Sequence, residues 1–153
     1  MIAEAGLGLL WIAAALAILQ FGLGCAAVAR RRDEQLSAVR AIAVTQGVLA
    51  ALSFLALIWV FLRSDMSVAL VAANSHSAKP WLYKFAGTWG NHEGSMLLWV
   101  TILGVSGLAV ALFERSLKAS TLIATLAAQA ALSIGFYAFL LLSSNPFERL
   151  AEP

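Results

Sequence analysis

The chain has 153 residues, of which 61% are hydrophobic and only 12% are charged, with a formal net charge of +2. A soluble domain is roughly half apolar and about a quarter charged, so this composition excludes a soluble enzyme and indicates a membrane protein. The basic residues flank apolar stretches and form no basic face with interleaved aromatic residues. This pattern argues against nucleic acid as a partner.

Four apolar stretches are long enough to cross a bilayer as helices, which takes about 20 residues each. They cover residues 5–29, 42–62, 95–113 and 119–142, and they leave a loop at 63–94 and a tail at 143–153. We therefore expect an all-α membrane protein with four transmembrane helices. The start "MIAEAG" carries an acidic residue and no basic one. It opens an apolar run too long for a signal peptide, so it is not read as a cleaved leader.

The distribution of basic residues predicts the orientation in the membrane. The two short loops hold the densest positive charge, from Arg30, Arg31, Arg32 and Arg40 after the first span and from Arg115 and Lys118 after the third. Short loops rich in Lys and Arg stay in the cytoplasm. We therefore expect loop 63–94 and both termini to face the periplasm of a bacterial inner membrane.

Within the four spans, the most polar residues are Gln20, Gln46 and Gln129. Ion and proton paths normally need charged or imidazole groups inside the membrane, so the spans do not indicate a pump. Small residues in the third span predict close helix contacts; they are Gly104, Gly107 and Ala111. The single cysteine, Cys25, excludes an internal disulfide and is expected to be buried as a small apolar residue.

The loop at 63–94 predicts two short helices at the membrane surface. In "SDMSVALVAA" polar residues precede an apolar face made of Met66, Ala69, Leu70 and Ala73, as in a surface helix. Pro80 suits the first turn of the second helix.

In that second helix an aromatic stripe recurs every four residues, beside Lys84: Trp81, Phe85 and Trp89. The stripe has two interpretations. Tryptophan at the lipid–water boundary anchors a helix at the level of the headgroups, which is the more common case. Alternatively, the aromatic surface and Lys84 could receive a flat, anionic ligand.

The stretch "TWGNHEGSMLLW" places polar residues where the third span begins. It lacks the second imidazole of an H-E-x-x-H zinc motif, because position 96 is Met, so no metal site and no catalytic residue is assigned. Asn91 can cap the span, and Glu93 in the first turn suits the helix dipole. His92 is more often a structural or supporting residue in such a place than a metal or haem ligand.

The tail "SSNPFERL" resembles a helix start. Asn145 fits a helix N-cap, Pro146 the first helical position, and Glu148 the third position of a capping box. So short a helix gains little alone. We therefore expect the chain to be a fragment or one piece of a split protein.

The segment "SVALVAANSHSAKPWLYKFAGTWGNHEGSMLLWV" resembles the amino-terminal region of the cytochrome c maturation protein F (CcmF) family, the membrane haem lyase component. The matching positions are Asn74, Ser75, Pro80, Tyr83, Lys84, Trp89–Ser95, Leu97–Trp99 and the tail Ser143–Leu150. The resemblance extends over essentially the whole chain. No segment resembles the family's Trp-rich haem-handling motif, which lies further along the full-length proteins.

The resemblance implies a role in attaching haem covalently to apocytochrome c. It implies haem b in the full-length family, with no haem ligated by this segment alone. The implied partners are the remainder of the CcmF-like protein, other maturation subunits, a haem carrier and apocytochrome c. Candidate cofactor contacts are Trp89, His92 and Glu93 at the mouth of a haem chamber, together with Trp81 and Lys84. The alternative is a non-catalytic membrane module that holds other maturation subunits.

Overall fold

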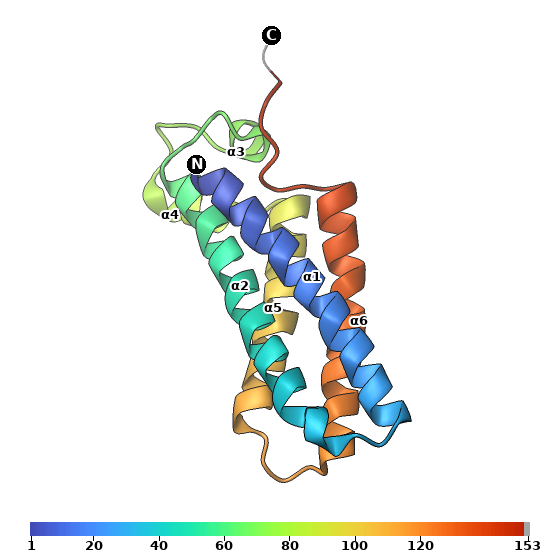
Figure 1. Ribbon diagram of the computed structural model, residues 1–153. Helices are drawn as coiled ribbons and strands as arrows, with labels where there is room; N and C mark the ends of the chain where they lie inside the picture. The colour runs from blue at the N-terminus through green and yellow to red at the C-terminus, as the bar shows by residue number, and fades with distance from the viewer. Residues whose placement is uncertain (152–153) are drawn as a thin grey trace.

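The computed structural model describes residues 1–151, which form an antiparallel bundle of four long helices (Figure 1). These helices are α1 (Ile2–Ala29), α2 (Leu36–Leu62), α5 (His92–Phe113) and α6 (Ala119–Leu142). Both α1 and α5 pack against α2 and α6, so the four helices form a ring around a shared interior. All four are long and apolar enough to cross a membrane. The predicted all-α membrane fold is confirmed.

Three of the long helices begin earlier than the apolar runs that announced them, at residues 2, 36 and 92 instead of 5, 42 and 95. All four long helices end where the apolar runs end, at residues 29, 62, 113 and 142. A helix extends into polar residues at its aqueous edge because hydrogen bonding continues where hydropathy falls. Apolar length therefore underestimates helix length at these edges.

Small residues let the helices approach closely where the sequence predicts it. A Cβ on Gly47 of α2 would lie 2.5 Å from the carbonyl oxygen of Gly104 on α5. A Cβ on Gly107 would lie 2.8 Å from the Gln129 amide of α6. Ala111 is also buried, so the expected contact face of the third span is confirmed.

Glutamine side chains connect the helices inside the bundle. Gln20 of α1 donates to the carbonyl oxygen of Leu126 (2.7 Å) and to Oε1 of Gln129 (2.8 Å), both on α6. Gln46 of α2 donates to Oε1 of Gln20 (3.0 Å) and accepts from the hydroxyl of Tyr137 (2.9 Å). Gln20, Gln46 and Tyr137 are essentially inaccessible to solvent.

Gln129 extends this network to the fourth helix. Its Nε2 donates to the carbonyl oxygen of Leu103 on α5 (2.9 Å) and to the hydroxyl of Ser133 (3.1 Å). One continuous set of hydrogen bonds thus links all four helices. We call Gln20, Gln46, Gln129, Ser133 and Tyr137 the glutamine network.

The outer faces of the long helices are apolar. Large side chains are exposed on each of them, for example Trp11, Leu55, Ile102 and Leu132. Cys25 is also exposed, so the expectation that it is buried is wrong. It lies on the outer side of α1 in a groove walled by Phe21, Val28 and alanines of α6. The face of α1 that packs inward is occupied by smaller residues, including Gly24 and Ala27.

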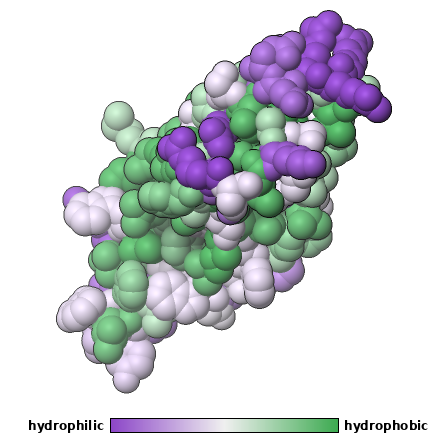
Figure 2. Space-filling model, turned by 90° about the horizontal axis from the view of Figure 1, so that it is seen from below, coloured by the Kyte–Doolittle hydropathy of each residue, from purple (hydrophilic) through white to green (hydrophobic). Residues whose placement is uncertain are grey.

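The two ends of the bundle differ. One end carries the two short interhelical loops, where hydrophilic side chains gather on an otherwise largely hydrophobic surface (Figure 2). Its exposed residues include Arg30, Arg31, Arg32, Arg115 and Lys118. The other end carries both the N-terminus and the tail, together with the short helices α3 (Ala69–Asn74) and α4 (Trp81–Gly87) (Figure 1).

The first surface helix differs from its prediction. It begins at Ala69 and buries Leu70 and Val71, whereas Ala73 is exposed. Asp65 does not cap this helix; its carboxylate accepts from the backbone N–H of Ser67 (3.2 Å) and from the Ser67 hydroxyl. This local turn competes with helix formation, as is typical of Asp and Ser.

The helix predicted at Asn145 is wrong over the described residues. Asn145 Oδ1 accepts from the backbone N–H of Phe147 (2.9 Å), which forms a turn. The tail then runs antiparallel to the residues before α3: Ala69 N donates to Glu148 O (2.8 Å) and Leu150 N to Ser67 O (2.9 Å). Asn-Pro begins a turn as readily as a helix, and burial of the Phe147 ring beside Gly6 favours the turn here.

Candidate functional site

The candidate site lies at the end of the bundle that carries both termini. A tight turn between α4 and α5 positions its central residues. Asn91 Oδ1 accepts from the backbone N–H of Gly94 (2.6 Å), and Asn91 Nδ2 donates to the carbonyl oxygen of Gly87 (2.7 Å). The predicted N-cap of the third span is confirmed. The carbonyl of Thr88 lies so close to Gly94 that a Cβ there would collide with it.

His92 is the first residue of α5 and is exposed. Its ring meets the ring of Phe139 on α6 edge to face, with 5.5 Å between the centroids and 82° between the planes. This contact orients the imidazole along the α5–α6 side of the bundle. Because the side chain is exposed, the imidazole is also accessible to a neighbouring molecule.

Glu93 lies in the first turn of α5, where a carboxylate interacts favourably with the helix dipole. It forms one wall of a groove of about 220 Å³ between α5, α3 and the tail. The other walls include Asn74, Asn145 and Glu148. Apolar side chains of α3 complete the lining, so the groove is mixed in character and carries two carboxylates.

The aromatic stripe is only partly formed. The rings of Phe85 and Trp89 meet edge to face at 4.9 Å between centroids. However, α4 ends at Gly87, so Trp89 lies in the turn beyond the helix and packs, partly buried, against the core. Trp81 at the other end of α4 is 70% exposed. Lys84 donates to the carbonyl oxygen of Ser77 in the preceding loop (3.1 Å).

The five predicted contact residues thus fall into two groups. Trp89, His92 and Glu93 are gathered by the turn that starts α5, and of the three only Trp89 packs against the core. Trp81 and Lys84 belong to α4, whose side chains are not buried.

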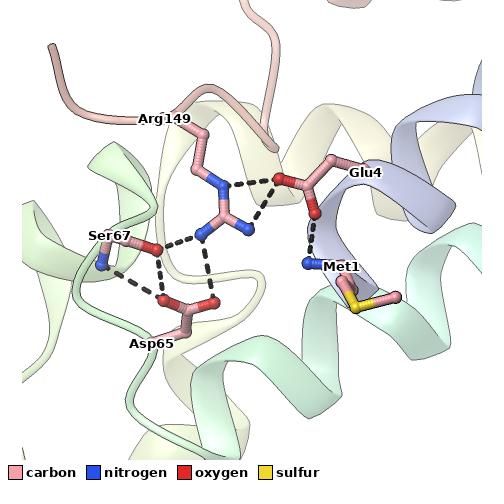
Figure 3. A network of polar contacts seen from close by, with 5 residues as sticks. All are labelled: Met1, Glu4, Asp65, Ser67 and Arg149. Carbon is pink, nitrogen blue, oxygen red and sulfur yellow. Dashed lines mark hydrogen bonds and ion pairs between the residues drawn. The ribbon is translucent and has the colours of Figure 1, made fainter.

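A polar contact network near the N-terminus was not anticipated from the sequence. Arg149 of the tail reaches Glu4 of α1 through Nε (2.8 Å) and Nη2 (2.7 Å), and Asp65 through Nη1 (3.3 Å) (Figure 3). The same guanidinium donates to the Ser67 hydroxyl, and the amino group of Met1 pairs with Glu4. We call this set the Arg149 clasp. The sequence contains Arg149 in the tail and the acidic residues Glu4 and Asp65, but these are far apart in sequence and no local pattern predicts that they pair.

The clasp changes the titration of Asp65. The hydroxyl of Ser67 and then the Arg149 guanidinium hold the pKa of this carboxyl below its ordinary value of 3.8. Hydrogen bonds and positive charge both favour the ionised form. The clasp is therefore fully charged at neutral pH.

Candidate metal ligands are not clustered among the described residues. These residues contain no group of three or more His, Cys, Asp or Glu side chains placed to hold a metal. His76 and His92 are both exposed, and neither lines any of the four grooves described between the helices and loops.

Comparison with known proteins gives a consistent result. No protein-family model matches the chain. The cytochrome c-type biogenesis protein CycK of Bradyrhizobium diazoefficiens is 46% identical over 153 residues, which cover 100% of this chain and 23% of that protein. CcmF of Pseudomonas aeruginosa is 45% identical over 150 residues, 98% of this chain and 23% of the relative.

CcmF of Escherichia coli K12 is 37% identical over 149 residues, 97% of this chain and 23% of that protein. The solved structure of cytochrome c haem lyase CcmF superimposes with a TM-score of 0.91 at 27% identity, covering 100% of this chain and 26% of that chain. The chain thus spans about a quarter of the length of the relatives it matches. Identity over this whole length, together with the shared four-helix fold, shows that the chain belongs to the CcmF/CycK family of cytochrome c-type biogenesis proteins.

Proposed function

We propose that the chain works in cytochrome c maturation, as the amino-terminal portion of a haem lyase component, and supplies membrane scaffold and surface beside the haem site. One observation carries the proposal: 46% identity to CycK along all 153 residues. The fold similarity to the solved haem lyase, with a TM-score of 0.91, supports it.

The reaction of the complete system is the addition of two apocytochrome thiols across the two vinyl groups of haem. Each sulfur bonds to one vinyl carbon and each thiol hydrogen ends on the other, so no oxidant is consumed. We assign no nucleophile, acid or haem ligand to this portion. Its proposed contribution is a membrane scaffold and part of the surface on which haem, its carrier and the apocytochrome come together.

Trp89, His92 and Glu93 are the residues proposed to border the haem chamber. The turn around Asn91 holds them together at the start of α5. The exposure of His92 and the groove beside Glu93 support a role as neighbours of the site.

We also propose that both termini face the periplasm. The concentration of exposed arginine at the opposite end of the bundle supports this orientation. The maturation chemistry takes place on the periplasmic side, so Trp89, His92 and Glu93 would be on the productive side.

A chimera tests the proposal. In Pseudomonas aeruginosa CcmF, the matching segment is replaced by this chain, and the chimera is expressed in a strain that lacks CcmF. Covalent cytochrome c is measured by haem staining of denaturing gels. We expect cytochrome c to be restored. A chimera that is inserted and abundant but yields no cytochrome c would contradict the proposal.

The alternative function is an assembly module that holds other maturation subunits. The exposed apolar side chains of α4 favour it, because such surfaces mark contacts with other molecules. Photo-crosslinkers at Trp81 and Trp89 in the chimera separate the two. Labelling of haem supports a chamber border, and labelling of protein alone supports the assembly module.

A further inference from the structure

We propose that α4, together with Lys79 and Lys84, is an anchor that sits in the headgroup layer of the membrane and binds the phosphates of anionic lipids. This inference does not depend on the proposed role in cytochrome c maturation. It assigns to α4 the first of the two interpretations of its aromatic residues and adds a specific lipid chemistry.

Helix α4 lies exposed on the surface of the described structure. None of its seven residues is buried. Its large apolar side chains are widely exposed: Trp81 70%, Leu82 56%, Tyr83 61% and Phe85 37%. A helix of two turns is marginal in water without an apolar partner. A contiguous exposed apolar surface of this kind indicates contact with lipid or with another molecule.

Helix α4 packs beside the upper end of α2 (Figure 1), and a Cβ on Gly87 would lie 3.6 Å from Cε1 of Phe61 in the last turns of that helix. The end of a membrane-spanning helix marks the level of the headgroups. Trp and Tyr concentrate at this level because one part of the ring prefers lipid and the polar part prefers water. In contrast, α3 buries Leu70 and Val71 within the protein.

The exposed residues of α4 are spread around the helix. Trp81, Leu82 and Tyr83 are consecutive, so they point about 100° apart around the helix axis. A flat ligand such as haem covers one face only. A lipid layer in which the helix is partly immersed covers several faces at once, which fits this distribution.

The positive charges beside α4 are available to an anion. Lys79 donates to the carbonyl oxygen of Asn74 (3.2 Å) and Lys84 to that of Ser77 (3.1 Å). The ion pairs found among residues 1–151 involve Met1 and Arg149 with Glu4 and Asp65, and neither lysine. An ammonium group has three donors, so each lysine keeps two for an anion. Arg63, stacked on Trp59 at 5.8 Å, adds a third cation at this end of α2. Lipid phosphates would complement all three.

Site-directed spin labelling tests the anchor. Cys25 is replaced by Ser, and a nitroxide is attached to a single new cysteine on α4. One variant carries the label at Leu82→Cys. A second carries it at Ala86→Cys, which keeps every large side chain of α4. Both positions are exposed. The matched control is Ala73→Cys, exposed on α3. The purified chain is placed in nanodiscs of phosphatidylcholine alone or mixed with phosphatidylglycerol, and collisions with oxygen and with a water-soluble nickel chelate are compared.

We expect the ratio of oxygen to nickel collisions to be several-fold higher on α4 than at position 73 in anionic nanodiscs. The double variant Lys79→Gln/Lys84→Gln should move the α4 ratio toward the control value, while Lys118→Gln at the opposite end should not. Equal ratios on α4 and at position 73 would overturn the anchor. Immersion that is insensitive to phosphatidylglycerol and to both lysines would overturn the binding of anionic lipid. Shielding of α4 from both reagents would show contact with a second copy of the chain instead.

Discussion

At the scale of single residues, the glutamine network is the most constrained part of the bundle. Gln20 uses both amide hydrogens and its carbonyl oxygen within the protein. A buried polar group that loses its partner costs more than the hydrogen bond itself contributed. The network therefore selects one alignment of the four helices, since a slip of one helix would leave several buried amides unpaired.

Replacing Gln20 by Leu should lower the free energy of unfolding by about 1–2 kcal/mol, because Gln46, Gln129 and the Leu126 carbonyl each lose a partner. Denaturation in detergent micelles measures this. Thr125→Val is the matched control, because Thr125 is exposed and bonds only its own helix. An unchanged or higher stability of Gln20→Leu would mean that apolar packing alone aligns the helices.

His92 provides a second prediction at this scale. His92→Ala in the full-length chimera should leave the haem b absorbance of the membrane protein intact, because the exposed imidazole packs on Phe139 and is not placed as a ligand. Visible spectra of the purified, folded variant measure it. Loss of the haem spectrum would assign His92 to ligation and overturn its place at the border of the chamber.

At the scale of elements, the turn between α4 and α5 depends on one glycine. Gly94→Ala places a methyl group against the carbonyl of Thr88, whereas a Cβ on Gly90 would make only ordinary contacts, the shorter at 3.5 Å to Ala86 O. Overpacking of this kind costs about 1–3 kcal/mol. We expect Gly94→Ala to lower the unfolding temperature and Gly90→Ala to have little effect. Similar unfolding temperatures for the two variants would contradict the close contact at Gly94.

The tail is attached by the Arg149 clasp, and Arg149→Gln should loosen it. The ion-paired side chains are 36% to 57% exposed, so water screens the pairs and the expected loss of stability is small. Hydrogen exchange should become faster at the amides of Ala69 and Leu150, which pair the tail with the residues before α3. Arg115→Gln at the other end of the bundle is the control, and equal exchange in both variants would show that the clasp does not hold the tail.

The pH dependence of the clasp follows from Asp65. Its pKa in the folded protein lies below the ordinary value of 3.8. A carboxyl with a depressed pKa stabilises the folded state at higher pH, and this contribution is lost as the pH falls through the depressed value. Hydrogen exchange at Leu150, corrected for its intrinsic rate, should therefore show constant protection from neutral pH to about pH 5 and lower protection below 3.8.

At the scale of the whole molecule, the orientation in the membrane is the property to measure. In the Cys25→Ser background, Ala73→Cys should react in intact cells with a maleimide that penetrates the outer but not the inner membrane. Ser116→Cys, exposed in the loop before α6, should react only after lysis. The positive charge on the loops at that end is the physical reason. The reverse pattern would place both termini in the cytoplasm.

Hydropathy was sufficient to predict the class of fold and the last residues of the four long helices. The pattern of small residues in the third span predicted where helices approach each other closely. Each of these features depends on residues that are close in sequence. Asn91 as N-cap and Glu93 in the first turn of α5 are confirmed for the same reason. The motif around them was also specific enough to indicate the CcmF family.

Tertiary contacts were needed for the rest. Cys25 is exposed and the expected tail helix is a turn, because neighbours from α6, α1 and the residues before α3 settle which face or conformation is favoured. The Arg149 clasp joins residues 145 positions apart, and the glutamine network joins all four helices. No local pattern encodes such pairings, since an amide or a carboxylate is satisfied by whichever partner the folded chain brings within hydrogen-bonding distance.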